Sequence, residues 1–495
     1  MAAGRLPTLT YDRGTLLLHP PPRSKTWLDF ATWDDRVEKF RVPAQDYWAL
    51  VECLRQDGVQ FRDEARKYED LTFGPLPNAY PPYPHQQAAL SAWQQGGRRG
   101  VVVLPTAAGK TYLALLALQS TPRSTLIVVP TLDLMHQWYA QLADWYPQVG
   151  LLGGGSQDRT PLLVATYDSA AIHSESLGNC YGLLIFDECH HLPGDFYRGI
   201  AETAIAPFRL GLSATPERTD GKHQDLAVLI GPEVYRQQAQ DLAGIALAHH
   251  QVVPMRVELS APERVRYDQC LQVRDQFLAR LNIRLGGLEG WRSFVQASAR
   301  SRAGRQAMLA HQEARQLALG TPSKLRVLEE LIQRHHPERM LIFTQDNQTV
   351  YQISRQFLIP AITHQTPVKE RHRILQHFRE GTYPVLVVAR VLDEGVDVPA
   401  ARIAVWLAGS GSTRQFVQRL GRILRRGDTP DKQAILYEVI TSDTVEEGTA
   451  RRRHQGPDAT LRAADPAAPW GPTASPSAEP RPRAPESGDG TLGLF

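Results

Sequence analysis

Short apolar runs separated by helical segments occupy two stretches of the chain. In residues 80–235 the runs are Gly100–Leu104, Ser124–Val129, Leu162–Val164 and Leu183–Phe186; in residues 322–450 they are Met340–Phe343, Val385–Val388 and Ile403–Trp406. Continuous apolar strands that alternate with helices are typical of a parallel sheet covered on both faces. The pattern therefore predicts an α/β fold with two parallel-sheet lobes.

The rest of the chain has a different pattern. Residues Leu9–Leu18 alternate around an Asp12–Gly14 turn, and Ala44–Gln56 has helical spacing, which predicts a small α+β N-terminal domain. Residues 260–320 look helical, and the Pro- and Arg-rich end has too few apolar side chains to fold. We expect five parts, with boundaries at 1–75, 76–245, 246–320, 321–450 and 451–495.

Composition limits the class of protein. The chain is 42% hydrophobic and 22% charged, as in globular proteins, and its net charge of +3 does not by itself indicate a nucleic-acid partner. The four cysteines lie far apart, which argues against a zinc ribbon or a disulfide framework. No apolar run approaches the roughly 18 residues of a membrane span, and no secretory signal is recognised. We expect a cytoplasmic location, with no membrane partner.

A phosphate-binding loop is predicted between the first apolar run and the helix Tyr112–Leu118. Backbone N–H groups of such a loop face the anion, the lysine reaches the terminal phosphates, and the threonine hydroxyl binds Mg²⁺. The usual glycine is missing at Leu104, and a positive φ at Ala107 would cost about 1 kcal/mol. An ordinary strand-to-helix turn is the alternative. The residues expected to bind nucleotide here are Thr106, Ala107, Ala108, Gly109, Lys110 and Thr111.

Two adjacent carboxylates, Asp187 and Glu188, follow the strand Leu183–Phe186. The carboxyl end of a parallel strand is where such sheets bind ligands. We expect Asp187 to hold Mg²⁺, partly through water, and Glu188 to orient and deprotonate the attacking water. A solvated pair of acids at the start of a loop is the alternative. The presence of Lys110 in the preceding strand–loop–helix favours the catalytic interpretation over it.

At this point the chain resembles superfamily 2 helicases over most of its length. By this resemblance Gln86 reads adenine, Thr131 and Thr166 grip the nucleic-acid backbone, and Ser213, Ala214 and Thr215 couple hydrolysis to strand movement. The second lobe contains segments similar to motifs IV, V and VI, at Leu341–Thr344, Asp393–Pro399 and Gln418–Arg425. The resemblance implies that two RecA-like motor lobes use ATP and Mg²⁺, with nucleotide contacts at Gly395, Asp397 and Gln418 and arginine fingers at Arg422 and Arg425. A basic helix face is the alternative for the two arginines.

A closer resemblance is to XPB-type DNA helicases, especially the compact archaeal and bacterial forms. It rests on Asp187–Ala201, Thr215–Gly221 and the stretch from Tyr11 to Asp63. It implies a DNA- or damage-recognition domain at 1–75 and a helical thumb at 246–320. The Arg-Glu-Asp motif of the family is Arg218-Thr219-Asp220 here, which leaves the strand-separating role of that loop open. We expect DNA contacts from Arg218, Asp220, Arg300 and Arg302; for the thumb arginines, a solvated helical surface is the alternative.

The resemblance predicts a 3′-to-5′ DNA helicase or translocase that acts on duplex, forked or damaged DNA in repair, in the nucleoid, with a repair nuclease as a further candidate partner. Two alternatives stay open. One is an ATP-gated DNA-binding or remodelling protein in which Ala107 and Ala108 weaken hydrolysis, and the other is an RNA-directed helicase. The last residues, Thr491–Phe495, resemble a bacterial sliding-clamp-binding peptide with threonine in place of glutamine; incidental apolar residues at a chain end are the alternative.

Overall fold

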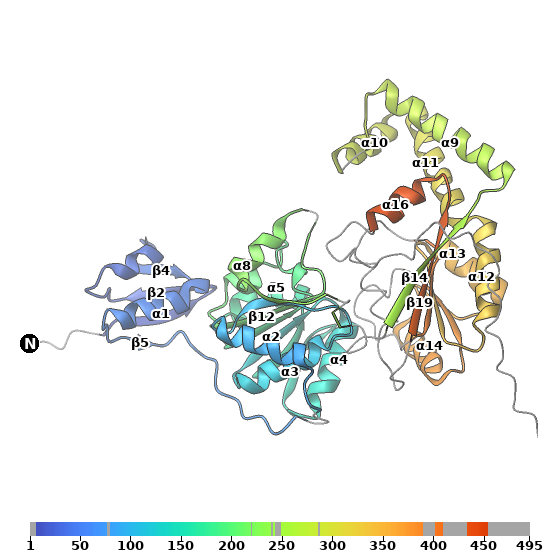
Figure 1. The fold of residues 1–495 in the computed structure, drawn as a ribbon. Coiled ribbons are helices and arrows are strands. Elements are labelled where there is room, and N and C mark those ends of the chain that lie inside the picture. Colours follow the sequence, from blue (N-terminus) through green and yellow to red (C-terminus); the bar gives the residue numbers. More distant parts are fainter. Residues whose placement is uncertain are drawn as a thin grey trace, which may run out of the picture.

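The computed structural model describes residues 6–76, 80–218, 220–238, 241–242, 249–285, 288–389, 401–408 and 433–453. Figure 1 shows a small N-terminal domain beside a first lobe, a second lobe next to the first, and three helices that project from the second lobe. The two lobes are α/β units built on parallel sheets, so the predicted fold class is confirmed.

The N-terminal domain is a five-stranded sheet with one α-helix packed against it. The sheet has the order β3-β4-β2-β1-β5. The predicted hairpin is present, and its turn uses positive φ angles at Arg13 and Gly14. The predicted helix begins as a 3₁₀ turn, and its four apolar positions are buried. The elements are β1 (Thr8–Asp12), β2 (Thr15–His19), η1 (Thr26–Phe30), β3 (Thr32–Asp34), β4 (Lys39–Pro43), η2 (Ala44–Asp46), α1 (Tyr47–Gln56) and β5 (Arg62–Asp63).

Specific contacts join this domain to the first lobe. The Tyr11 hydroxyl group donates hydrogen bonds to the carbonyl oxygens of Glu175 and Thr203, each at 2.9 Å. Ile205 of the first lobe is part of the hydrophobic core of the N-terminal domain. Burial raises the pKa of Tyr11 to about 12. The N-terminal domain is therefore packed against the first lobe through both apolar and polar groups.

The first lobe is built on a sheet of the order β13-β6-β12-β11-β7-β10-β8-β9 within the described residues. Its strands bury side chains on both faces, as continuous apolar runs predict. Helices α3 and α4 cover one face, and α5, α7 and α8 cover the other. The elements are α2 (Pro84–Gln95), β6 (Arg99–Val103), α3 (Lys110–Ser120), β7 (Thr125–Val129), α4 (Leu132–Ala143), β8 (Val149–Gly153), β9 (Ser156–Gln157), β10 (Leu162–Thr166), α5 (Tyr167–Ile172), α6 (Ser174–Leu177), β11 (Leu183–Asp187), η3 (Cys189–His191), α7 (Gly199–Glu202), β12 (Phe208–Ser213), η4 (Lys222–Asp225), α8 (Leu226–Leu229) and β13 (Glu233–Arg236).

The second lobe contains a parallel sheet of the order β14-β19-β18-β15-β17-β16 in the described part of the chain. The three strands predicted for this lobe are present at its centre. The elements are β14 (His249–Val257), α12 (Pro322–Arg334), β15 (Met340–Phe343), α13 (Asn347–Phe357), β16 (Ala361–Ile362), α14 (Val368–Glu380), β17 (Val385–Val388), β18 (Ile403–Trp406), β19 (Gln433–Thr441) and α16 (Val445–Arg453).

Strand β14 corrects the expectation that residues 246–320 are helical throughout. It pairs with β19 over its whole length and forms the edge of the second sheet. The sequence pattern concealed it because Pro254 interrupts the apolar run, and an edge strand tolerates proline. The helical part begins at Ala261 and consists of α9 (Ala261–Arg280), α10 (Leu288–Arg300) and α11 (Arg302–Gly320), which form the projecting thumb. Helix α16 includes Arg451–Arg453, the residues expected at the start of the tail.

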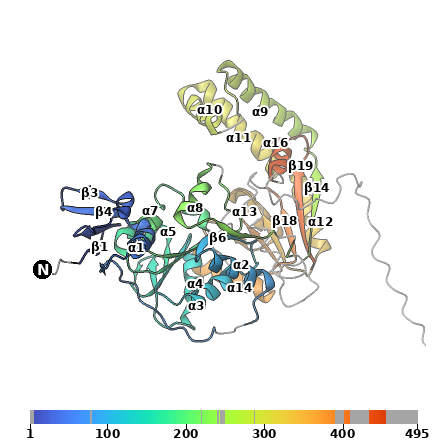
Figure 2. The same cartoon turned by 60° about the vertical axis from the view of Figure 1, so that its left-hand side comes forward.

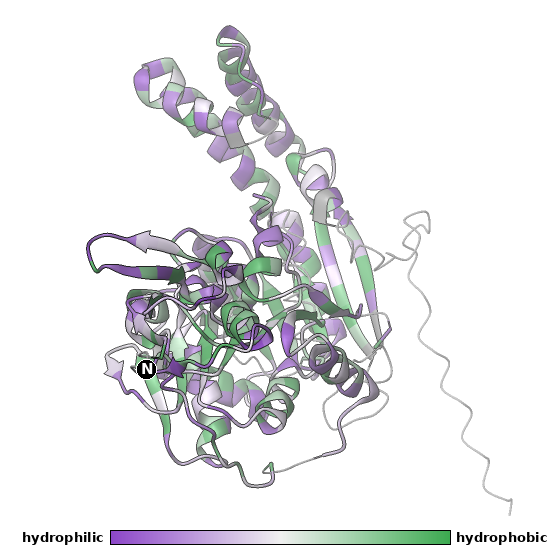
Figure 3. Cartoon of the chain, turned by 90° about the vertical axis from the view of Figure 1, so that its left-hand side faces the viewer, coloured by the Kyte–Doolittle hydropathy of each residue, from purple (hydrophilic) through white to green (hydrophobic). Residues whose placement is uncertain are grey.

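Hydropathy follows this architecture. Figure 3 shows hydrophobic strands inside both lobes and a mixture of hydrophilic and hydrophobic residues along the thumb helices. Among the described residues, no helix is both long enough and apolar enough to cross a membrane.

The two lobes are in direct contact through an ion pair. Arg371 of α14 binds Asp133 of α4, with 2.9 Å between Nη1 and Oδ2. Figures 1 and 2, which differ by a rotation of 60°, both place α14 near α4. This contact fixes one point at which the second lobe meets the first.

Candidate nucleotide-binding and catalytic site

The loop between β6 and α3 has the backbone of a phosphate cradle. Ala107 has φ 69° and Gly109 has φ 81°, and Gly109 is the N-cap of α3. The positive φ of Ala107 is therefore present, and it carries the cost stated above for a non-glycine residue. A side chain on Gly109 would meet the Gln86 amide nitrogen at 2.2 Å, so this position needs glycine for two reasons.

Helix α2 holds the loop from behind. His85 donates a hydrogen bond from Nε2 to the Ala108 carbonyl oxygen at 2.9 Å, and both side chains are buried. Gln86 is fully buried: its Nε2 lies 3.3 Å from the Gly109 carbonyl oxygen, and its Oε1 accepts the Tyr83 N–H. In this structure Gln86 thus supports the loop. Its predicted contact with adenine stays a prediction.

Asp187 lies at the carboxyl end of β11, where its carboxylate is held at both oxygens. Oδ1 accepts the backbone N–H of Glu188, and Oδ2 accepts the indole N–H of Trp138, each at 3.0 Å. The side chain is almost fully buried. Burial first, and then the negative charge of Glu188, raise the pKa of Asp187 above its ordinary value, while Lys110 and Trp138 act in the opposite direction.

Glu188 connects three segments that are far apart in the sequence. Its Oε1 lies 3.7 Å from Lys110 Nζ, and its Oε2 lies 3.4 Å from His190 Nδ1 and 3.5 Å from the Ser213 hydroxyl oxygen. Ser213 also contacts His190 Nδ1 at 3.2 Å and accepts the Thr215 backbone N–H. The structure therefore brings Lys110, Glu188 and Ser213 together.

The residues of this site fit a nucleotide and its magnesium ion. Thr106 has a buried hydroxyl oxygen that lacks a hydrogen-bond partner among the described residues. It lies in the loop before α3, in which Ala107 and Gly109 have left-handed backbones. An anion at a helix N-terminus is bound by free backbone N–H groups. Lys110 and Thr111 are the first two residues of α3. Mg²⁺ is usually held by one or two carboxylates together with substrate phosphates, and Asp187 would provide such a carboxylate.

A cavity of about 490 Å³ adjoins the loop. Gly109 and Thr111 form one side of it, and Tyr80 and Tyr112 line it with stacked rings whose centroids are 4.1 Å apart. Its size lies within the usual range for small-molecule sites, and its walls are mostly apolar and aromatic. The cavity therefore offers room for a small ligand next to the phosphate cradle.

The two threonines predicted to grip nucleic acid occupy equivalent positions. Thr131 is the N-cap of α4 and Thr166 is the N-cap of α5; each accepts a backbone N–H at 3.3 Å. Thr131 follows β7 and Thr166 is the last residue of β10; these are neighbouring parallel strands, so both threonines lie at one edge of the sheet. Their predicted contact with a nucleic-acid backbone is compatible with this placement and stays a prediction.

The predicted charged contacts differ in their surroundings. Arg218 binds Asp220 with two hydrogen bonds, at 2.9 and 2.6 Å, and also donates to the His190 carbonyl oxygen. The two charges therefore offset each other. Arg300 and Arg302 lie exposed where α10 meets α11, without an ion pair among the described contacts.

Several predicted site residues fall outside the described residues. They are Thr219 of the Arg-Thr-Asp segment, Gly395, Asp397 and Gln418, the arginine fingers Arg422 and Arg425, and the peptide Thr491–Phe495. Their predicted roles stay predictions.

Sequence reasoning missed three side chains that shape the site. His85 binds the Ala108 carbonyl oxygen, His190 contacts the Ser213 hydroxyl group, and Trp138 binds Asp187. The spacing of residues cannot show these contacts, because each joins separate strands or helices. One signal was available for Trp138: a buried indole N–H needs an acceptor, and the adjacent strand ends in a carboxylate.

Comparison with known proteins matches three family models to the three main parts of the chain. Residues 9–65 match the Xeroderma pigmentosum group B helicase damage recognition domain, residues 79–218 match the type III restriction enzyme res subunit, and residues 323–427 match the helicase conserved C-terminal domain. Among solved structures, the Hef helicase domain of Pyrococcus furiosus matches with a TM-score of 0.53 and 18% identity, over 74% of this chain and 97% of that one. This last likeness concerns the fold.

Relatives that match most of this chain indicate its family more specifically. The DNA 3′–5′ translocase XPB2 of Sulfurisphaera tokodaii is 38% identical over 90% of this chain and 99% of its own length. The DNA 3′–5′ helicase XPB of Mycobacterium tuberculosis is 26% identical over 90% of this chain and 72% of its own. The yeast general transcription and DNA repair factor IIH helicase/translocase subunit XPB/SSL2 is 27% identical, and the match covers 83% of this chain and 46% of that protein.

The paired parallel-sheet lobes, with Lys110 and Glu188 in contact in the first, define a superfamily 2 helicase. Within that class the chain belongs to the XPB family.

Proposed function

We propose that this chain is an ATP-driven DNA translocase with 3′-to-5′ polarity, which opens or moves along duplex DNA in repair. The observation that carries the proposal is the position of Glu188, whose carboxylate contacts Lys110 on one side and His190 and Ser213 on the other. The name of the Sulfurisphaera relative, a DNA 3′–5′ translocase, supports the polarity and the substrate.

The residues of the site divide the work of hydrolysis. A bound nucleotide would supply the γ-phosphoryl group that is transferred to water, with ADP as the leaving group, and Mg²⁺ would supply positive charge that offsets the negative charge on the phosphates. Lys110 would bind phosphate oxygens, and Asp187 and Thr111 would hold the ion. Glu188 would orient the attacking water and accept its proton at Oε2, the oxygen that His190 and Ser213 hold in place.

Ser213 links the site to the segment that follows β12. It contacts Glu188 and His190 through one hydroxyl group, and it fixes the backbone of Thr215. These contacts connect the Glu188 carboxylate to the end of β12, which precedes the Arg218–Asp220 pair in the chain. This chain of contacts supports the proposed coupling of hydrolysis to strand movement.

Hydrolysis is tested first. The ATPase rate is measured without DNA and with forked or duplex DNA, with Lys110→Ala and Glu188→Gln as inactive controls. We expect stimulation by DNA in the native chain and at least about a thousand-fold loss in both variants. A rate that stays at background with every DNA would exclude the motor function. In that case nucleotide binding without turnover would favour the alternative of an ATP-gated binding protein. The strained backbone of Ala107 is the observation that motivates this alternative.

Polarity and substrate need a second experiment. Forked duplexes with a single 3′ or a single 5′ tail are compared in strand displacement, and a triplex-displacement assay detects movement without unwinding. We expect activity with the 3′ tail. Equal competition by structured RNA and by forked DNA would instead favour an RNA-directed enzyme, because contacts to the backbone alone distinguish the two poorly.

The proposal extends to partners and location. We propose DNA as the macromolecular partner, in the nucleoid of the cytoplasm, with a repair nuclease as a further partner. The segment Thr491–Phe495 is proposed to bind a sliding clamp through its apolar residues. Deletion of residues 491–495 with unchanged binding to the clamp would contradict this last proposal.

A further inference from the structure

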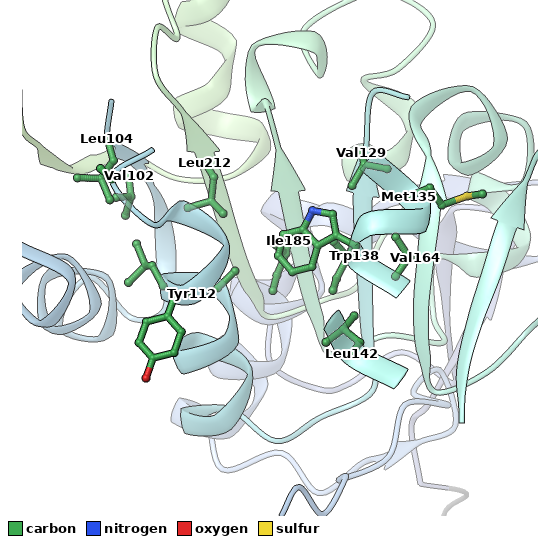
Figure 4. Close-up of a cluster of buried hydrophobic side chains, with 14 of the residues drawn as sticks. Val102, Leu104, Tyr112, Val129, Met135, Trp138, Leu142, Val164, Ile185 and Leu212 are labelled. Atoms are coloured by element: carbon green, nitrogen blue, oxygen red, sulfur yellow. The ribbon is translucent and has the colours of Figure 1, made fainter. Parts of the chain in front are cut away.

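Helix α4 carries a side chain, Trp138, that contacts the Asp187 carboxylate. Trp138 is 2% exposed, and its Nε1 donates to Asp187 Oδ2 at 3.0 Å. Figure 4 shows the Trp138 ring packed beside Ile185 of β11, with its nitrogen directed toward the carboxyl end of that strand. The other oxygen of Asp187 is held by the backbone of Glu188. Trp138 is thus the side chain outside the loop that fixes the rotation of this carboxylate.

The N-terminal end of the same helix is tied to the second lobe. Asp133, in the first turn of α4, binds Arg371 of α14 at 2.9 Å. The two side chains are 19% and 12% exposed, so the pair is shielded from much of the solvent. Arg371 also donates to the Thr366 carbonyl oxygen, which fixes its guanidinium on the second lobe.

A short rigid element therefore joins the two contacts. Asp133 and Trp138 are five residues apart, about 7.5 Å along a helix axis. Between the two contacts, α4 is anchored in the core by Met135, which is fully buried. We expect a displacement of α14 that moves Asp133 to move Trp138 as well, because packed helices move as units.

We propose that Trp138 is a positioning residue for Asp187, and that the Asp133–Arg371 pair makes its position depend on the second lobe. The inference rests on the proposed function, because it assigns to Asp187 the role of holding the magnesium ion of the nucleotide. It adds a link from the second lobe to the metal-binding carboxylate that does not pass through the arginine fingers.

The choice of acceptor distinguishes this role from core packing. Two other buried tryptophans of the same lobe donate to backbone carbonyl oxygens: Trp93 to Arg209 at 2.9 Å and Trp145 to Gly74 at 2.8 Å. A structural indole is satisfied by such a carbonyl oxygen. Trp138 instead donates to a side chain of the catalytic site, and a donor to a metal-binding group typically changes metal affinity 10- to 100-fold when it is removed.

The first test uses Trp138→Phe, which keeps the ring and removes the N–H, with Trp93→Phe as the matched control. Affinity for a fluorescent ADP analogue is measured with and without Mg²⁺, and Mn²⁺ binding with ADP is followed by electron paramagnetic resonance. We expect the Mg²⁺-dependent gain in affinity to fall at least about ten-fold in Trp138→Phe and to stay within two-fold of the native value in Trp93→Phe. An unchanged gain in Trp138→Phe, or an equal loss in both variants, would overturn the positioning role.

The second test addresses the link between the lobes and does not depend on a core substitution. Arg371→Gln removes a partly exposed charge, and we expect it to lower the Mg²⁺-dependent gain two- to five-fold. A charge reversal, Asp133→Arg with Arg371→Asp, is expected to restore at least half of that loss. In the combination Arg371→Gln/Trp138→Phe, the loss should equal that of Trp138→Phe alone; additive losses would refute the link.

The readouts separate this inference from the proposed function. A native chain that binds the analogue and Mg²⁺ but shows no DNA-stimulated hydrolysis would contradict the motor function and leave the positioning test intact. Normal hydrolysis in the native chain with no response to Trp138→Phe would contradict the inference alone.

Discussion

Ala107 occupies a backbone conformation that normally belongs to glycine, so its replacement by glycine should relieve strain. A non-glycine residue in the left-handed region costs about 1 to 2 kcal/mol. Two effects oppose the relief: glycine adds about 0.5 to 1 kcal/mol of unfolded-chain entropy, and the half-buried methyl group of Ala107 loses about 0.4 kcal/mol of burial. The net stability change for Ala107→Gly is therefore near zero or slightly favourable.

Ala108 provides the control that isolates the strain. It is 1% exposed, and its φ is not positive. Ala108→Gly carries the same entropy cost and loses a fully buried methyl group, about 0.8 kcal/mol, without any relief. The entropy cancels in the difference between the two variants. We expect Ala107→Gly to be more stable than Ala108→Gly by about 1.5 to 2.5 kcal/mol.

The assay is urea unfolding of the full chain, followed by the transition of the first lobe, together with nucleotide affinity. Because the loop already has its left-handed geometry, affinity and turnover should stay within about two-fold of the native values in Ala107→Gly. Equal stability of the two glycine variants would refute the strain argument. A ten-fold rise in turnover for Ala107→Gly would show that the alanine itself limits hydrolysis.

Three further substitutions test other parts of the structure. Lys324→Met should cost about 3 to 5 kcal/mol in unfolding free energy, because it leaves the buried Glu446 without its partner at 2.6 Å; adding Glu446→Gln should recover part of this loss, and an additive loss would contradict the pairing. Gly109→Ala should reduce nucleotide affinity at least about ten-fold, since the new carbon would meet Gln86 and the φ of 81° resists a side chain; affinity is measured by fluorescence titration, and an unchanged value would contradict the tight approach. Tyr11→Phe should lose about 1 kcal/mol of stability at neutral pH. Because folding raises the pKa of Tyr11 from 10.0 to about 12, its contribution is complete below pH 10 and is lost as the pH rises toward 12; a difference between wild type and variant that grows over this interval would contradict this sign.

The local parts of the nucleotide site could be predicted from the sequence. The spacing of Lys110 and Glu188 from their strands defines their position, because the carboxyl ends of parallel strands meet at one edge of a sheet. The loop also indicated that a positive φ at Ala107 would be strained, and the structure has this angle. Both inferences use residues that are close in sequence to a recognisable strand or helix.

Long-range contacts could not be predicted. The hydrogen bond from Trp138 to Asp187 and the ion pair between Asp133 and Arg371 depend on how helices cross a sheet or meet another lobe. Strand β14 was missed for a related reason: it owes its place to pairing with β19, nearly 200 residues away in the sequence, and not to an apolar run of its own.

Two of the three non-glycine residues with a positive φ in the described part of the first lobe lie where the chemistry is proposed to occur; the third is Arg98, directly before β6. Glu188, with φ 48°, and Ala107, with φ 69°, are non-glycine residues with left-handed backbones on the two loops that carry the site. Such conformations persist only where the surroundings hold them. Here the surroundings are visible: His85 and Gln86 hold the first loop, and the Asp187 carboxylate holds the backbone N–H of Glu188. The alanine at position 107 is therefore no argument against a formed phosphate cradle, because buried contacts impose the geometry that glycine would otherwise permit.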